Sequence, residues 1–294
     1  MHRVVPELIV SNYRAGRFGG EFTAVGMILD LSGFSRMTDT LMQHGQHGAE
    51  ALAGLMHGVF DPLVRSIFGY GGKIVSFAGD GIMALYPVEQ DRAQTALRAL
   101  ASAWVIQQGL LRDPERATVY GTFPLSVKIG ITVGVTEWRI LRSEDGGQAT
   151  YYFRGSAVDG SADAEHHASA GEILLTGSMN DLLRDWIETQ PHGSFHRFAG
   201  FLGEAPKPSP YTLPPVDVGI ARLFMPEEVI VHDMRGEFRQ IVNLFMRIPD
   251  LPDARLKEFI DAVFDLRRQY GGLLTRIDFG DKGCNLLMLW GAPV

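Results

Sequence analysis

The stretch MILDLSGFSRMTD covers residues 27–39. It begins with the last residues of a short apolar run, which the acidic residue Asp30 follows. A short apolar run of this kind predicts a buried strand. The stretch GGKIVSFAGDGIMALYP, residues 71–87, has two apolar runs around Ala-Gly-Asp-Gly, which predicts a β-hairpin with Asp80 at its tip. A strand end and a neighbouring hairpin tip can lie side by side in an antiparallel sheet, so Asp30 and Asp80 can come together.

Helical periodicity separates the predicted strands. The helix before the hairpin should bend at Pro62, because proline cannot donate a backbone hydrogen bond. Its apolar face consists of Leu52, Leu55, Met56, Val59, Phe60, Leu63, Val64 and Ile67. A second helix should follow the hairpin and end before Pro114. The later elements are predicted at 125–133 (strand), 151–153 (strand), about 158–169 (helix) and 173–175 (strand). This order predicts an α+β fold, with a mixed sheet, a βαββαβ core and helices on one face.

The composition indicates a globular protein with a large core, because 46% of the 294 residues are hydrophobic and 21% are charged. The net charge of −7 argues against a protein that coats nucleic acid, since phosphate binding requires a basic face. No apolar run approaches the ~20 residues of a membrane span, and Glu7 interrupts the only apolar stretch near the start. One cysteine, Cys284, excludes an internal disulfide. We therefore expect a cytoplasmic protein without a nucleic-acid partner or a membrane span.

A proline-rich segment divides the chain. The sequence PKPSPYTLPP, residues 206–215, has five prolines in ten positions and predicts an extended linker. After it, the element order of the first part begins again about 200 residues later, with Tyr-Gly-Gly at 70–72 and again at 270–272. The sequence thus predicts an N-terminal arm (1–21), a first domain (22–205), a linker (206–216) and a truncated second copy (217–294) of a longer protein.

Two features of the sequence can carry chemistry. Asp30 and Asp80 together could ligate Mg²⁺, which prefers carboxylate oxygens completed by substrate phosphates. The alternatives are that Asp30 caps a helix and that Asp80 belongs to an Asp-Gly type I′ turn. The start of the helix after Ser32-Gly33-Phe34-Ser35 offers backbone N–H groups to phosphate, although Ser35 could simply cap that helix.

Together, the two quoted stretches resemble the class III nucleotidyl cyclase catalytic domain, and more narrowly the first cyclase domain of the soluble, bicarbonate-responsive adenylyl cyclases. The segment QYGG…DKGCNLLMLWGAP, within 269–293, is similar to the start of their second domain. The resemblance implies a ferredoxin-like fold and cyclisation of ATP, with GTP less favoured, to cyclic AMP and pyrophosphate. It also implies two divalent cations, Mg²⁺ or Mn²⁺.

The resemblance also implies roles for particular residues. Asp30, Asp80 and the backbone carbonyl of Leu31 would ligate the metals. Lys128 would contact phosphate, although a strand lysine can also be a solvated edge residue. The remaining implied contacts are backbone N–H groups at Gly33, Phe34 and Ser35 for phosphate, and the side chains of Arg276 and Asp278 for the base.

Departures from the family pattern limit what this chain can do alone. Asp159 and Asp163 stand where cyclases place the asparagine and arginine that act on the transition state, and like charge would repel it. Asn243 aligns with Asp30, so the second copy lacks half of the metal pair. Ala162 and Ser76 replace residues linked to bicarbonate. We therefore expect little or no turnover, no bicarbonate activation, and a need for a complete second domain in the same longer chain or in a dimer partner.

Two other readings remain open from the sequence. One is a non-catalytic cyclase-homology module that binds nucleotide or a partner. The other is a diguanylate-cyclase-like phosphotransferase, but its Gly-Gly-acid-acid-Phe hairpin is replaced here by the sequence around Asp80. No P-loop, serine-hydrolase or HExxH motif is present.

Overall fold

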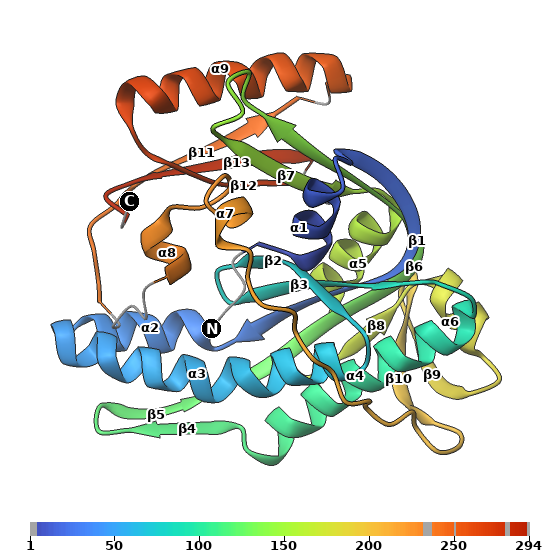
Figure 1. The fold of residues 1–294 in the computed structure, drawn as a ribbon. Coiled ribbons are helices and arrows are strands. Elements are labelled where there is room, and N and C mark those ends of the chain that lie inside the picture. The colour runs from blue at the N-terminus through green and yellow to red at the C-terminus, as the bar shows by residue number, and fades with distance from the viewer. Residues whose placement is uncertain (1–4, 232–236, 250, 280–282, 293–294) are drawn as a thin grey trace.

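The computed structural model describes residues 5–231, 237–249, 251–279 and 283–292. The largest unit is an eight-stranded sheet with the order β2-β3-β1-β6-β8-β10-β9, and β7 also pairs with β6 (Figure 1). Its strands are β1 (Gly19–Ser32), β2 (Lys73–Ala78), β3 (Gly81–Pro87), β6 (Ser126–Arg142), β7 (Ala149–Arg154), β8 (Ile173–Leu175), β9 (Ile187–His192) and β10 (Phe195–Phe201). The β6–β8 pair is parallel and the other pairs are antiparallel, so the sheet is mixed, as predicted.

Helices cover both faces of this sheet, so the prediction of helices on one face is wrong. The strand residues Leu29 and Ile129 face a core that also contains α2 (Phe34–Met42), α3 (Gly45–Gly69), α4 (Arg92–Arg112) and α6 (Gly177–Leu183). The opposite face carries α5 (Ser156–His167). The strands present glycines to this helix, which leaves no room for a side chain. A Cβ on Gly26 would lie 2.0 Å from the Ala157 carbonyl oxygen, and a Cβ on Gly130 would lie 2.1 Å from the Glu165 nitrogen. The helix therefore lies directly on the strand backbones.

The β2–β3 hairpin forms as predicted, but its turn differs from the expected type. Ala78 pairs with Gly81, which leaves Gly79 and Asp80 as the two loop residues. Gly79 has φ +65°, whereas none of the described non-glycine residues, Asp80 among them, has a positive φ. A type I′ turn needs positive φ at both positions, and glycine at the first alone fits type II′. Asp80 is therefore not required by the turn.

Elements outside the main sheet flank its ends. A two-stranded hairpin, β4 (Glu115–Thr118) and β5 (Gly121–Pro124), follows α4. Helix α3 continues through Pro62.

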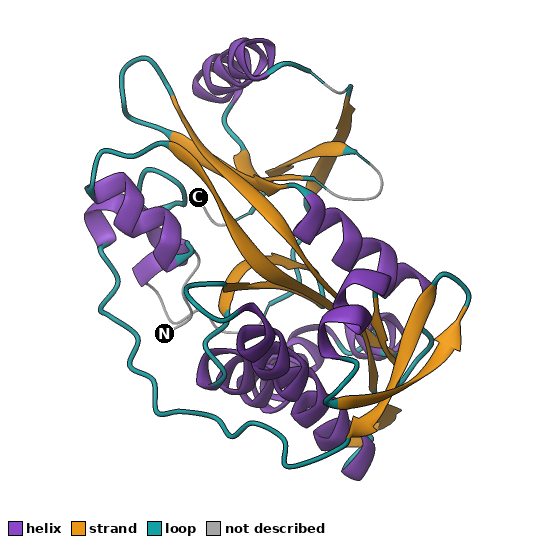
Figure 2. Cartoon of the chain, turned by 90° about the vertical axis from the view of Figure 1, so that its right-hand side faces the viewer, coloured by secondary structure: helices purple, strands orange, loops and turns teal. Residues whose placement is uncertain are grey.

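Residues 204–217, which include the proline-rich segment, contain neither helix nor strand and run along the outside of the molecule (Figure 2). The Ser209 nitrogen there donates to the Gly69 carbonyl at 2.8 Å. None of the described helices is long and apolar enough to cross a membrane.

Short helices before and after the main sheet contact each other. Helix α1 (Glu7–Arg14) precedes β1, and α7 (Val218–Ala221) and α8 (Glu227–Val231) follow the proline-rich segment. Arg14 of α1 forms an ion pair of 2.7 Å with Asp217, which caps α7. The N-terminal arm and the segment after the linker thus pack together against the sheet.

The last part of the chain forms a separate three-stranded sheet with the order β11-β13-β12, shown at the top of Figure 1. Its elements are β11 (Val242–Ile248), α9 (Asp253–Tyr270), β12 (Leu273–Asp278) and β13 (Cys284–Trp290). The first unit has the same arrangement in β1-β3-β2. The register shift between Ile74 and Ser76 also recurs between Leu274 and Arg276.

This repetition corrects one alignment made from the sequence. A Cβ on Gly72 would meet Tyr86, and one on Gly272 would meet Trp290, so Tyr86 and Trp290 correspond. Tyr86 pairs with Val25, and Trp290 pairs with Val242. Val25 on β1 therefore corresponds to Val242 on β11. Asp30 and Arg247 each lie the same distance further along these two strands, so Asp30 corresponds to Arg247 and the alignment with Asn243 is wrong. The loop at 280–282, part of the predicted second hairpin, lies outside the described residues.

Candidate functional site

Asp30 lies near the end of β1 and beside the hairpin that carries Asp80. The register between β1 and β3 ends with the pair Leu29–Ile82, so Asp30 lies next to Gly81. A Cβ on Gly81 would lie only 3.7 Å from the Asp30 Oδ1 atom. Since Asp30 is inside a strand and α2 starts at Phe34, it caps no helix. The strand end and the hairpin tip therefore meet as the sequence indicated.

The charge on Asp80 is disfavoured in this position. Burial, followed by the neighbouring Asp30 carboxylate, raises the pKa of the Asp80 carboxyl above its usual range, while Lys128 works in the opposite direction. Two like charges placed this close repel each other unless a cation neutralises them. A bound divalent cation would relieve this repulsion.

The oxygen donors present here fit Mg²⁺ or Mn²⁺. The Leu29 carbonyl oxygen lies 3.4 Å from the position of a Gly81 Cβ, so it points toward the hairpin. Carbonyl directions alternate along a strand, so the Leu31 carbonyl points the same way, beyond the last paired residue of β3. Among the described residues no three acidic, histidine or cysteine side chains form a metal group. Magnesium sites commonly combine one or two carboxylates with phosphate and water oxygens.

Lys128 lies directly opposite Asp30 in the β1–β6 register, with its Nζ atom 3.6 Å from the Asp30 Oδ2 atom. It is not a solvated edge residue, because β6 is a central strand. Its Nζ atom is 2.6 Å from the Oε1 atom of Glu165 on α5. Burial opposes the charge, but the hydrogen bond that Lys128 donates to Glu165 and the charges of both acids raise the pKa of the Lys128 ammonium. The sequence analysis did not single out Glu165.

The segment around Gly33 forms a sharp entry into α2. Gly33 has φ +97°, and a Cβ there would lie 2.3 Å from the Pro124 carbonyl oxygen, so only glycine fits. No side chain caps the helix, so Ser35 is not an N-cap. Phe34 and Ser35 form the first turn, and the backbone N–H groups of a first turn have no partner within the helix.

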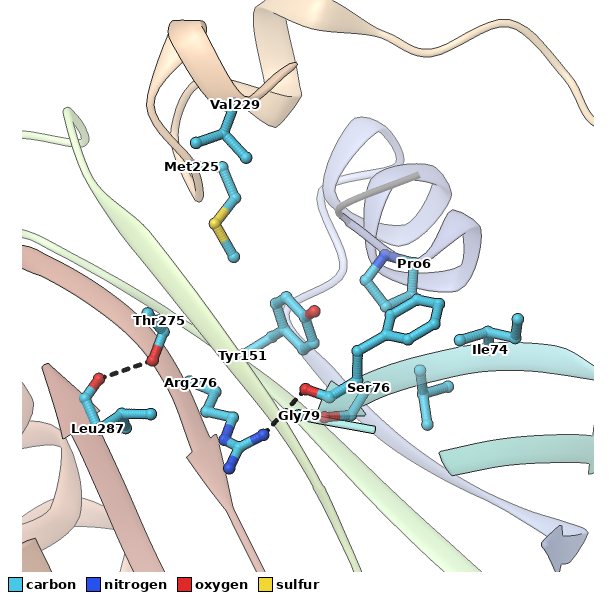
Figure 3. A pocket seen from close by; sticks show the side chains of 12 residues that line it. Pro6, Ile74, Ser76, Gly79, Tyr151, Met225, Val229, Thr275, Arg276 and Leu287 are labelled. Atoms are coloured by element: carbon cyan, nitrogen blue, oxygen red, sulfur yellow. Dashed lines mark hydrogen bonds between the residues drawn. The ribbon is translucent and has the colours of Figure 1, made fainter. Parts of the chain in front are cut away.

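Arg276 and Asp278 lie on β12 of the second sheet, and Arg276 faces a pocket that the β2–β3 hairpin also lines (Figure 3). The Arg276 Nη1 atom donates to the Phe77 carbonyl at 2.9 Å, and its Nε atom lies 2.5 Å from the Asp278 Oδ2 atom. The pocket has a volume of about 340 Å³, and its wall includes Ser76, Gly79, Tyr151, Thr275 and Arg276. Arg276 thus contacts the strand that leads to Asp80, and Asp278 pairs with Arg276.

Asp278 yields a pH-dependent prediction. Burial raises the pKa of the Asp278 carboxyl, although the Arg276 guanidinium opposes this. In the unfolded chain an aspartate titrates near ~3.9. The Asp278 carboxyl therefore keeps its proton to a higher pH in the folded protein than in the unfolded chain. The stability that this proton contributes is lost as the pH rises from the unfolded pKa through the folded pKa. We expect Asp278→Asn to melt increasingly above the wild type between pH 4 and 7 in thermal unfolding scans. The exposed Asp185→Asn is the control, and a lower melting temperature for Asp278→Asn at pH 7 would contradict the prediction.

The positions that replace the cyclase asparagine and arginine lie on α5. Asp159 faces a second pocket, of about 870 Å³, whose wall also contains Arg247 and Glu137. Asp163 instead pairs with His167, at 3.4 Å, and is exposed. Ala162 lies between them on the same helix. Asp159 and Arg247 therefore share a pocket that Asp30 and Asp80 do not line.

Sequence comparisons identify relatives of this chain among known proteins. No protein-family model matches the chain. Human adenylate cyclase type 10 is 22% identical over 98% of the chain and 21% of its own length, and the rat protein is 28% identical over 63% of the chain and 12% of its own length. The chain thus spans at most about a fifth of the length of these relatives.

Solved structures give the same result for the fold. The guanylyl cyclase Cya2 superimposes with a TM-score of 0.52 and 25% identity, over 65% of this chain and 98% of the other. The adenylyl cyclase CyaB from P. aeruginosa gives a TM-score of 0.51 and 19% identity, over 63% of this chain and 96% of the other. The chain is therefore a homologue of adenylate cyclase type 10 that carries the fold of a class III nucleotidyl cyclase domain.

Proposed function

We propose that this chain contains the metal-binding half of an adenylate cyclase site, which converts ATP to cyclic AMP and pyrophosphate in cytoplasmic signalling. The observation that carries the proposal is the approach of Asp30 to the hairpin tip with Asp80. Homology to adenylate cyclase type 10 supports ATP as the substrate. Guanylyl cyclases share the fold, so GTP is the competing substrate.

In this proposal Asp30, Asp80 and the Leu31 carbonyl would hold two divalent cations together with the triphosphate. When bound, the cations supply charge that lowers the pKa of the ribose 3′-hydroxyl and neutralises the leaving pyrophosphate. The 3′-oxygen forms a bond to the α-phosphorus, the bond to pyrophosphate breaks, and the hydroxyl proton leaves to solvent. The two carboxylates fix the geometry of this displacement from one end of the sheet.

Phosphate contacts come from the entry to α2 and from β6. The backbone N–H groups at Gly33, Phe34 and Ser35 would donate to the β- and γ-phosphates, which the positive end of the helix dipole also attracts. Lys128, beside Asp30, would add a charged contact.

The base would enter the pocket between the hairpin and β12, where Arg276 offers donors, and Asp278, which pairs with Arg276, would hold the guanidinium in place. Replacing Arg276 by alanine is expected to change the ratio of ATP to GTP affinity, because the guanidinium lines this pocket. Competition between the two nucleotides for a fluorescent ATP analogue in Mn²⁺ would measure the ratio. Parallel weakening of both nucleotides would remove Arg276 from base recognition.

A second cyclase unit is needed to complete the site. We propose that 22–205 is one unit, joined by the linker 206–216 to the beginning of another at 217–294. The matching strand order and register shift support this division. Arg247 at the position of Asp30 is a cation and cannot ligate metal, so the described residues of the second unit offer no counterpart to Asp30. The transition-state asparagine and arginine would come from a complete second unit in a longer chain or a dimer partner.

The test is to measure nucleotide binding and turnover by the 294-residue chain. We expect Mn²⁺-dependent ATP binding with little or no cyclic AMP formation, because Asp159 and Asp163 cannot stabilise the transition state. Rapid cyclic AMP formation would overturn the requirement for a second unit. ATP binding that is independent of Mn²⁺ would favour a non-catalytic regulatory module.

A further inference from the structure

Glu165 is the residue near the metal pair to which the proposed function gives no role. It lies on α5, 12 residues long, and its side chain is only 15% exposed. Its Oε1 atom is 2.6 Å from the Lys128 Nζ atom, whereas the Asp30 Oδ2 atom is 3.6 Å from the same nitrogen. The ammonium therefore lies between two acids and nearer to Glu165.

The close packing of α5 fixes Glu165 at this place. A Cβ on Gly130 would lie 2.1 Å from the Glu165 nitrogen and 2.2 Å from the Ser161 carbonyl oxygen. Alternate residues of a strand share a face, so Lys128 lies on the same side of β6 as Gly130. The helix backbone touches the strand here, and the carboxylate of Glu165 reaches Lys128 from the helix side of the sheet.

Without Glu165, Lys128 would be a competitor for Asp30. Lys128 already lies within ion-pair distance of Asp30, and residues directly opposite in an antiparallel pair have Cβ atoms about 4.5–5.5 Å apart, so the ammonium can move closer to Asp30 still. An ammonium on that carboxylate repels a divalent cation and occupies one of its oxygens. Attraction to Glu165 opposes this approach.

We propose that Glu165 is a positioning residue that draws the Lys128 ammonium toward itself and limits its contact with Asp30 to 3.6 Å, so that a divalent cation can displace the ammonium from the Asp30 carboxylate and the ammonium is directed to phosphate. This inference rests on the proposed function, because it assumes that Asp30 ligates metal. It adds the prediction that metal affinity depends on a helix residue that itself ligates nothing.

The test is Mn²⁺ affinity of the full chain without nucleotide, measured by electron paramagnetic resonance of free Mn²⁺. Glu165→Gln is expected to weaken binding about tenfold, because Lys128 then pairs with Asp30. Lys128→Met removes the competitor and is expected to bind Mn²⁺ at least as tightly as the wild type. The double variant Glu165→Gln/Lys128→Met is expected to regain the affinity of Lys128→Met.

The double variant separates positioning from simple loss of negative charge. If Glu165→Gln weakens Mn²⁺ binding equally with and without Lys128, the carboxylate acts only through its charge and the positioning role is overturned. Unchanged affinity in Glu165→Gln alone also overturns it. Glu188→Gln, an exposed change of the same charge, should have no effect, and circular dichroism should show all variants folded.

Failure of the proposed function gives a different result. If Mn²⁺ binding by the wild type is absent, or is insensitive to Asp30→Asn, the metal assignment is wrong and both proposals fall. If Asp30→Asn abolishes binding while Glu165→Gln leaves it unchanged, only the role of Glu165 is overturned.

Discussion

Asp30→Asn and Asp80→Asn are each expected to lower the affinity for Mn²⁺·ATP by about 100-fold, or about 2.8 kcal/mol, in titration calorimetry. Each change removes one negative charge from a pair that lies beside a single hairpin tip. An amide oxygen is a weaker ligand than a carboxylate, so the remaining acid cannot bind two cations alone. Nucleotide binding should therefore lose its dependence on the metal.

Loss of folding would not explain such a result. Because its surroundings raise the pKa of Asp80, its charge destabilises the metal-free protein, and Asp80→Asn should melt no lower than the wild type. Asp61→Asn, a change on α3 at a half-exposed residue that pairs with Arg65, serves as the control and should bind Mn²⁺·ATP normally. Full Mn²⁺·ATP affinity in either Asp30→Asn or Asp80→Asn would contradict the metal assignment.

Gly130→Ala is expected to lower the free energy of unfolding by about 3 kcal/mol, because the added Cβ would overlap the α5 backbone. The overlapping atoms are backbone, which cannot rotate away as a side chain can, so the helix itself must shift. Thermal unfolding should show a drop of about 10 °C. Since Glu165 lies at the point of overlap, Mn²⁺ affinity should fall as well.

Gly54→Ala is the matched control for this change. Gly54 lies in α3, and nothing is within 4 Å of its Cβ position. Alanine favours helix over glycine by about 0.5–1 kcal/mol, so this variant should be slightly more stable than the wild type. An equal loss of stability in the two variants would show that α5 is not packed on β6 at Gly130.

Local sequence patterns predicted the elements that carry the site. The apolar runs around Asp30 and Asp80 predicted the strand and the hairpin, and the helical spacing of the apolar residues before the hairpin predicted α3. These patterns work because each element buries one periodic face. The same reasoning missed β4 and β5, whose sequences, ERAT and GTFP, have no apolar run.

Contacts between distant segments could not be predicted in this way. The packing of Gly26 and Gly130 against α5 cannot be recognised in the local sequence, since glycine also marks turns. For the same reason the helices were all assigned to one face, and Glu165 was not recognised. Asn243 was matched to Asp30 from the repeat in the sequence alone, whereas strand register, which depends on the partner strand, selects Arg247.

The convergence of Asp30 and Asp80 on shared cations is tested most directly by anomalous diffraction from crystals of the chain grown with Mn²⁺ and a non-cyclisable ATP analogue. We predict Mn²⁺ peaks at bonding distance from carboxylate oxygens of both residues, with the triphosphate along the start of α2. Mn²⁺ bound elsewhere, or nucleotide bound with neither carboxylate in contact with the metal, would contradict it.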